Sequence, residues 1–183
     1  ASVFTLFKQE PVGTLIGDFN ATDPDPWATL SYTLHGPSAH LFAIDSNGTL
    51  SSNSIFNFEN DPIIYSLVVR VSDEHNASDS VTREIQLLNR NESPRDLARI
   101  TQGLYENLAV GSIIAEFNAS DPDTNASLFY SFQEGNGSND NGLFQLSNHG
   151  ILSTEVVFDY ESNRSSYSLQ LSVSDEHNFS IDG

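Results

Sequence analysis

The chain carries the same sequence pattern twice. Residues 12–25 (VGTLIGDFNATDPD) return as residues 110–123 (VGSIIAEFNASDPD), and residues 65–76 return as residues 167–178. A repeat of roughly a hundred residues is a whole domain rather than one turn of a solenoid. The two copies can therefore be compared position by position. Positions kept in both serve the fold or a shared site, and positions that differ indicate something local.

Both copies show the period of β-strands. Apolar and polar residues alternate over residues 65–72 and again over residues 167–174. A period of two predicts a strand with one buried face. Turn clusters such as residues 46–48 and 148–150 separate the strands, and no segment sustains a helical period. We therefore expect an all-β fold of two tandem immunoglobulin-like antiparallel β-sandwich domains arranged end to end.

The boundary between the two domains is expected in the polar segment 89–94, which closes with Pro94. The predicted domains are residues 1–91 and residues 92–183. Domains of this size bury only about 60–65% of their unfolded surface, so their stability is modest. Because the chain has no cysteine, metal ions or neighbouring domains are the expected stabilisers in place of disulfides.

The charge balance excludes several kinds of partner. The chain has 25 Asp and Glu against 7 Lys and Arg, a formal net charge of −18. Nucleic acid and anionic membrane surfaces need basic patches, so neither is an expected partner. Direct membrane insertion is not expected, because no apolar run approaches the ~20 residues of a span. The acidic residues serve either solubility alone or the binding of cations.

Asn-x-Ser/Thr sequons are dense, and none has proline in the middle. Such sites accept covalent glycans only in a secretory pathway and on exposed backbone. They predict an extracellular or cell-surface glycoprotein; the simpler alternative is that Asn, Ser and Thr merely abound in loops. The sequons begin at Asn20, Asn47, Asn76, Asn91, Asn118, Asn125, Asn136, Asn163 and Asn178.

Several short motifs follow one another at residues 105–107, 121–123, 143–146, 150–152, 158–161 and 167–175. Their order and spacing resemble those of a cadherin repeat. The resemblance covers nearly the whole chain, and it implies a tandem-repeat protein with a structural or adhesive role outside the cell. The linker at residues 91–94 looks most like the degenerate linkers of cadherin-like repeats in bacterial surface proteins.

The resemblance implies Ca²⁺ between successive domains, where six to eight oxygen ligands form a loose cage. By position, the internal junction would use Glu59, Asn91, Glu92, Asp121, Asp123 and Asp175, with Asn57 as a further candidate. The front pole of the first copy would use Asp23, Asp25 and Asp73. The rear pole of the second copy would use Glu106, Asp159 and Glu161.

The first copy departs from this ligand pattern. Asn57 stands where the second copy has Asp159, and Lys8 aligns with Glu106, with Glu10 as a substitute ligand. Fewer carboxylates bind calcium more weakly, so we expect one calcium or none at the internal junction. The alternative is that these acids cap strands and turns in a fold that has lost its ions.

The two copies also differ at their ends. After residue 76 the first copy continues through a final strand to residue 88, whereas only residues 179–183 follow the second copy's motif. On one interpretation the chain is a piece of a longer array, and residues 1–7 are the first strand of their own domain. On the other, residues 1–8 are donated head to tail into a neighbouring copy, where Val3, Phe4 and Leu6 fill an apolar groove. Such a contact would propagate as a filament.

The leading hypothesis is a building block of an elongated, glycosylated fibre or surface rod, joined by strand donation and stiffened by calcium. The alternatives are a fragment of a longer tandem-repeat adhesin and a carbohydrate-binding sandwich that uses Trp27. We expect no enzyme and no catalytic residues. The repeated Asp-Glu-His-Asn at 73–76 and 175–178 offers one histidine per copy, without the convergent ligands or the base and nucleophile that catalysis needs.

Overall fold

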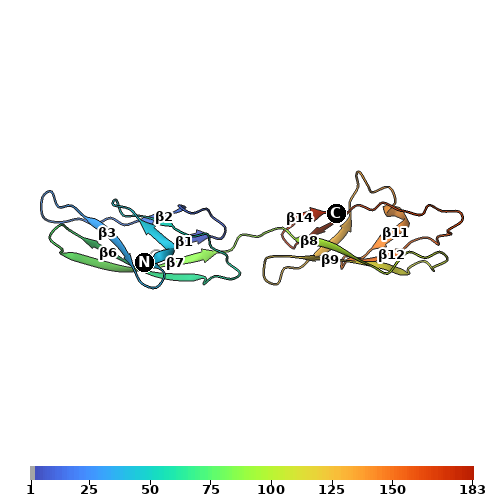
Figure 1. The fold of residues 1–183 in the computed structure, drawn as a ribbon, viewed down its shortest axis with the longest axis horizontal. Coiled ribbons are helices and arrows are strands. Elements are labelled where there is room, and N and C mark those ends of the chain that lie inside the picture. Colours follow the sequence, from blue (N-terminus) through green and yellow to red (C-terminus); the bar gives the residue numbers. More distant parts are fainter. Residues whose placement is uncertain (1–2) are drawn as a thin grey trace. The chain divides into compact units, whose positions relative to one another are not determined.

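The computed structural model describes residues 3–183 and is built from β-strands, as the alternating pattern predicts. It consists of two compact units, residues 1–90 (domain one) and 91–183 (domain two), which are described separately below (Figure 1). The helical segments among the described residues are two short 3₁₀ turns, η1 (Ala39–Leu41) and η2 (Asn141–Leu143). None of the described helices is long and apolar enough to cross a membrane.

Domain one is a sandwich of two sheets. One sheet has the order β1-β7-β6-β3 and the other has the order β2-β5-β4. Side chains from the facing sides of the two sheets fill a single core. The strands are β1 (Phe4–Phe7), β2 (Leu15–Asp18), β3 (Ser31–His35), β4 (Phe42–Ile44), β5 (Thr49–Ser52), β6 (Ile64–Ser72) and β7 (Ser78–Leu88).

The long hairpin of β6 and β7 forms the centre of this domain. The two strands pair antiparallel from Ile64↔Gln86 to Ser72↔Ser78. The alternation along β6 turns Tyr65, Leu67 and Val69 into the core, and Leu67 is 0% exposed. The period of two thus places one face of the strand against the opposite sheet.

The first strand, β1, completes its own domain. It pairs parallel with β7, from Phe4↔Ile85 to Phe7↔Leu88. Leu6 is 4% exposed in the domain core, Phe4 packs against that core, and Val3 is exposed. Residues 1 and 2 lie outside the described part of the chain. Donation of this strand to a neighbouring copy is therefore not what the structure shows, because β1 already buries its apolar face and pairs with its own β7.

Domain two repeats the sandwich with sheet orders β11-β12-β9-β8 and β10-β13-β14. Its core gathers around Val173, Leu171, Phe144 and Phe158. The strands are β8 (Arg95–Thr101), β9 (Ile113–Ser120), β10 (Phe129–Phe132), β11 (Phe144–Leu146), β12 (Ile151–Thr154), β13 (Leu171–Ser174) and β14 (Ser180–Asp182).

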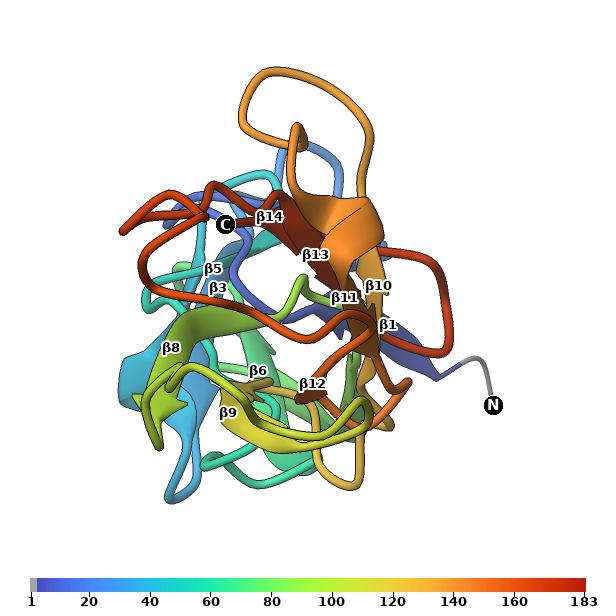
Figure 2. The same cartoon turned by 90° about the vertical axis from the view of Figure 1, so that its right-hand side faces the viewer.

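Domain two has a further strand, β14, after β13. β14 pairs antiparallel with β13, from Ser172↔Asp182 to Ser174↔Ser180, and the two lie side by side in Figure 2. It spans 3 residues, whereas β7 of domain one spans 11. The expectation that the second copy has no last strand is wrong at residues 180–182. An open groove of about 300 Å³ elsewhere in domain two is lined by Ile114, Phe144, Leu152, Tyr167, Leu169 and further residues.

Candidate metal sites

One end of domain two gathers acidic side chains from three separate segments. Asp121 and Asp123 follow β9, Asp175 follows β13, and Asn91 and Glu92 begin the domain. The Asn91 amide donates to Asp175 Oδ2 (2.6 Å), and the Glu92 backbone N–H donates to Asp123 Oδ2 (2.8 Å). The Asp123 N–H donates in turn to Asp121 Oδ1 (2.8 Å). The structure therefore brings together these five residues, all of them expected as calcium ligands.

Asp121 is the electrostatic centre of this group. Its Oδ2 is buried and has no hydrogen-bond partner among the described residues. Burial raises the pKa of the Asp121 carboxyl, and the hydrogen bond from the Asp123 backbone N–H opposes this rise. The nearby carboxylates of Asp123, Asp175 and Glu176 raise the pKa further. A buried carboxylate oxygen without a partner is costly. A bound cation would satisfy this oxygen, so the group fits a hard divalent ion.

Asp175 is held ionised by its neighbours. Only 3% of the residue is exposed. Burial works against its charge, but hydrogen bonds from the Asn91 amide and the backbone N–H groups of Phe179 and His177 keep its pKa below the usual value. Because hydrogen bonds to the charged form favour that form, Asp175 stays an anion available to a metal.

The other end of domain two carries the expected rear-pole residues Glu106, Asp159 and Glu161. Each offers a carboxylate oxygen, and these oxygens all lie within 4.8 Å of one another on exposed side chains. The Ser162 hydroxyl and the Glu161 N–H lower the pKa of Asp159. Three anions at this separation repel one another, and a shared cation would remove the repulsion. The structure thus brings these three side chains together, and their role in metal binding stays a prediction.

A fixed backbone frame supports this carboxylate trio. The Asn107 N–H donates to the Phe158 carbonyl (2.8 Å), and the Asp159 N–H donates to Asn163 Oδ1 (2.7 Å). The Glu161 N–H donates to Asp159 Oδ1 (3.1 Å). Asn107 has a positive φ of 58°. We call these contacts the pole frame.

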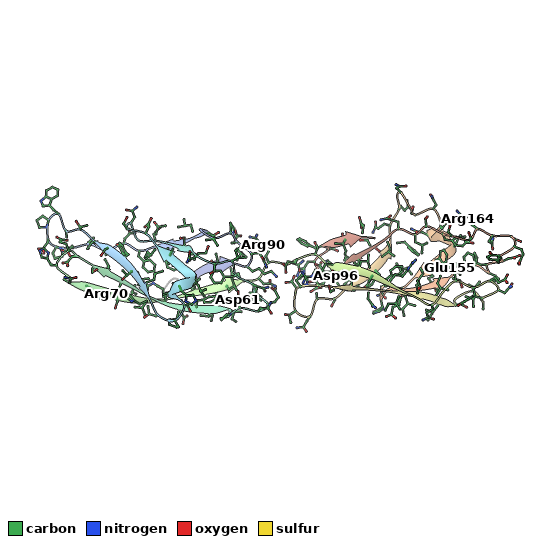
Figure 3. All side chains as sticks on the ribbon, in the orientation of Figure 1. Asp61, Arg70, Arg90, Asp96, Glu155 and Arg164 are labelled. Carbon is green, nitrogen blue, oxygen red and sulfur yellow. The ribbon has the colours of Figure 1, made fainter. Side chains whose placement is uncertain are left out.

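Domain one contains the same pole frame with different charges. The Gln9 N–H donates to the Phe56 carbonyl (2.9 Å), and Gln9 has a positive φ of 62°. The Asn57 N–H donates to Asp61 Oδ2 (2.7 Å), and the Glu59 N–H donates to Asn57 Oδ1 (2.9 Å). Asp61 is labelled at this end of the domain in Figure 3. The shared frame places Lys8 in the position of Glu106.

Lys8 forms an ion pair with Glu59 inside domain one. Its Nζ donates to Glu59 Oε1, and the two side chains are 1% and 14% exposed. Glu59, an expected calcium ligand, is therefore already neutralised by a cation of its own domain. Glu10, the suggested substitute ligand, accepts instead from Arg90 Nη2 (2.8 Å). Comparison of the two copies in the sequence showed that Lys8 stands where the second copy has Glu106. It did not show that Lys8 pairs with Glu59.

The front-pole residues of domain one are occupied mainly by local hydrogen bonds. Asp23 Oδ1 accepts from the Asp25 N–H (2.8 Å), and Asp73 Oδ1 accepts from the N–H groups of His75 (2.9 Å) and Ala77 (2.8 Å). Among the described residues, these three carboxylates do not converge as closely as Glu106, Asp159 and Glu161 do. Their part in metal binding stays a prediction.

The repeated Asp-Glu-His-Asn motif builds a turn. In both copies the Asp side chain accepts backbone N–H groups of the turn, and the Asn has a positive φ, 69° at Asn76 and 65° at Asn178. Glu74 accepts from the Thr29 N–H (2.8 Å), and Glu176 accepts from the Ser127 N–H (2.8 Å). The glutamates thus clamp an adjacent loop, a role that sequence reasoning missed although their repetition signalled a shared function.

Trp27 lies on the surface of domain one. It is 96% exposed, whereas the aromatic contacts of domain one among the described residues join rings of the core region, such as Phe42, Phe56 and Tyr65. A carbohydrate platform would need further exposed rings beside Trp27. The arrangement of the rings therefore does not favour the carbohydrate-binding alternative.

Eight of the sequon asparagines are exposed, and Asn91 is the exception. Its Nδ2, the atom to which a glycan would attach, donates to both the Glu92 carbonyl (3.0 Å) and Asp175 Oδ2 (2.6 Å). A glycosylated amide keeps one hydrogen and could not make both bonds. We expect Asn91 to remain unmodified in protein made in a secretory pathway, while an exposed site such as Asn47 is modified. Site-resolved mass spectrometry would contradict this by finding equal occupancy at Asn47 and Asn91.

The structure defines two tandem β-sandwich repeats with clustered carboxylates, and comparison with known proteins identifies their family. The model of the cadherin domain matches residues 3–88 and 102–182, so the chain belongs to the cadherin family. Cadherin domains are extracellular adhesion modules and not enzymes. The expectations of a cadherin fold, an extracellular location and no catalysis are thereby confirmed.

Animal proteins are among the relatives. The chain is 32% identical over 174 residues to Protocadherin-23 of Homo sapiens, and this match covers 87% of the chain but 5% of that protein. It is 32% identical over 177 residues to the protocadherin-like wing polarity protein stan of Drosophila melanogaster, covering 90% of the chain and 5% of that protein. The crystal structure of human Protocadherin-24 EC1-2, form II, gives a TM-score of 0.74 at 22% identity, covering 100% of this chain and 92% of that one.

Proposed function

We propose that this chain is a pair of consecutive repeats in the extracellular part of a calcium-dependent adhesion protein. The observation that carries the proposal is the buried, unpartnered Asp121 Oδ2 at an end of domain two where other acids converge. The exposed sequons support a glycosylated surface. Since the chain spans 5% of the first relatives, the longer rod to which it would belong is part of the proposal.

The donor atoms at both ends of domain two suit calcium. Calcium takes six to eight oxygens, several from carboxylates, in flexible geometry. Asp121, Asp123 and Asp175 would hold an ion at one end, with the Asn91 carbonyl oxygen as a neutral candidate. Glu106, Asp159 and Glu161 would hold an ion at the other end. When bound, calcium neutralises the clustered charges and ties together loops that otherwise repel.

The proposal does not include strand donation between copies. Release of β1 would expose Leu6, which is 4% exposed, and would break the pairing of β1 with β7. We place the repeats in series along one chain instead. We propose a second copy as the adhesive partner of the assembled rod. Sedimentation analysis of the chain with and without calcium tests for this self-association.

Calcium is expected to raise the melting temperature of the full chain. Extracellular calcium modules bind with Kd values of about 10⁻⁴–10⁻³ M, so 10 mM calcium is roughly 10–100 times Kd. Binding to the folded state alone then adds up to about 2.7 kcal/mol. Thermal melting in calcium and in chelator measures this gain. The double variant Glu106→Gln/Glu161→Gln should lose part of it.

A matched control is Glu84→Gln, which removes an exposed carboxylate on β7 of domain one that belongs to neither candidate site of domain two. It should keep the full calcium response. The proposal fails if 10 mM calcium leaves the melting temperature unchanged, or if Glu84→Gln reduces the response as much as Glu106→Gln/Glu161→Gln.

A further inference from the structure

Both domains contain the pole frame, but the side chains that it holds carry different charges. In domain two the frame holds three carboxylates, those of Glu106, Asp159 and Glu161, whose oxygens lie within 4.8 Å of one another. In domain one the corresponding residues are Lys8, Asn57 and Glu59. The backbone hydrogen bonds of the frame agree closely, 2.8 Å and 2.9 Å for Asn107 and Gln9, and 2.7 Å for both Asp159 and Asn57. The difference therefore lies in the side chains and not in the backbone.

The residues of domain one do not fit calcium at this position. The Lys8 ammonium donates to Glu59, so the acid that would bind a metal already has a positive partner. Asn57 replaces a carboxylate by a neutral amide, and its Oδ1 accepts the Glu59 N–H. Lys8 is also 1% exposed, so its charge is kept among protein groups rather than in water. A divalent ion near this fixed ammonium would be repelled.

We infer that the Lys8 ammonium takes the place of calcium at this end of domain one. The lysine is a cation carried by the chain itself, and it neutralises Glu59 whatever the calcium concentration. This end of domain one is then ordered with or without calcium, whereas the matching end of domain two depends on the ion. The inference rests on the proposed function for the calcium response of domain two.

The test is to give domain one the side chains of domain two in the full chain. The double variant Lys8→Glu/Asn57→Asp restores the carboxylate trio on the existing frame. Isothermal titration should find at least one more bound calcium than in the wild type. Amide NMR signals of residues 56–61 should become calcium-sensitive in the variant, and domain one should melt lower in chelator and recover in calcium.

The single variant Lys8→Gln is the control, because it removes the positive charge without adding a carboxylate; it should gain no calcium. The inference is overturned if wild-type domain one already melts higher in calcium than in chelator. It is also overturned if the double variant folds in calcium but binds no additional ion. Failure of the proposed function would be seen in a different measurement. The amide NMR signals of residues 158–163 of the wild type would then not respond to calcium, regardless of the signals of residues 56–61.

Discussion

Replacing Lys8 by methionine is expected to destabilise domain one by about 3 kcal/mol. Methionine keeps much of the apolar stem of the side chain but removes the ammonium that neutralises Glu59. Loss of one member of a buried ion pair costs about 3–5 kcal/mol because the other charge stays behind. Glu59 is 14% exposed, which favours the lower end of that range. Urea unfolding should show a lower midpoint with an unchanged slope.

Two further variants separate the ion pair from general damage. Lys8→Met/Glu59→Gln removes both charges and should recover much of the stability, giving a clear coupling in a double-mutant cycle. Arg90→Met breaks the Arg90–Glu10 pair, whose side chains are 60% and 27% exposed, and should cost at most about 1 kcal/mol. Additive losses in the cycle would contradict a direct role of Lys8 as counter-ion.

Replacing Leu67 by alanine is expected to cost domain one about 3 kcal/mol of unfolding free energy. Leu67 is 0% exposed in the centre of β6 and lies in the core cluster with Phe42, Tyr65 and Ile85. Truncation of a buried leucine costs about 2–5 kcal/mol, because contacts are lost and a cavity remains. In a domain of this size the melting temperature should fall by roughly 10–20 °C, measured by calorimetry.

Ile64→Ala on the same strand is the matched control. Ile64 is 53% exposed, so the same kind of truncation should change stability by about 0.5 kcal/mol or less. If Leu67→Ala and Ile64→Ala lowered the unfolding free energy by similar amounts, the face of β6 that carries Leu67 would not be the buried one.

Local patterns were sufficient to predict much of the fold. Alternation over residues 65–72 predicted β6, with Leu67 facing the core, and the duplicated segments predicted two sandwiches. These features depend on neighbours in sequence and on a period of two, which a single chain displays directly. The family motifs also predicted the convergence of Glu106, Asp159 and Glu161.

Contacts between distant segments could not be predicted in this way. Lys8 and Glu59 are 51 positions apart, and the sequence showed a substitution at residue 8 without showing where its side chain goes. The clamp between Glu74 and the Thr29 backbone joins residues 45 positions apart. Both depend on side-chain direction and burial in the folded domain, and a strand period carries no information about either.

The parallel pairing of β1 with β7 has a mechanical consequence. The chain enters domain one just before β1 and leaves it just after β7, and the two strands run in the same direction. Tension on the two ends of the domain would therefore pull the strands past each other along their length. All the hydrogen bonds between them would bear the load together, whereas a hairpin opened from its ends breaks one bond at a time. We therefore expect domain one to resist extension when it is pulled from its two ends.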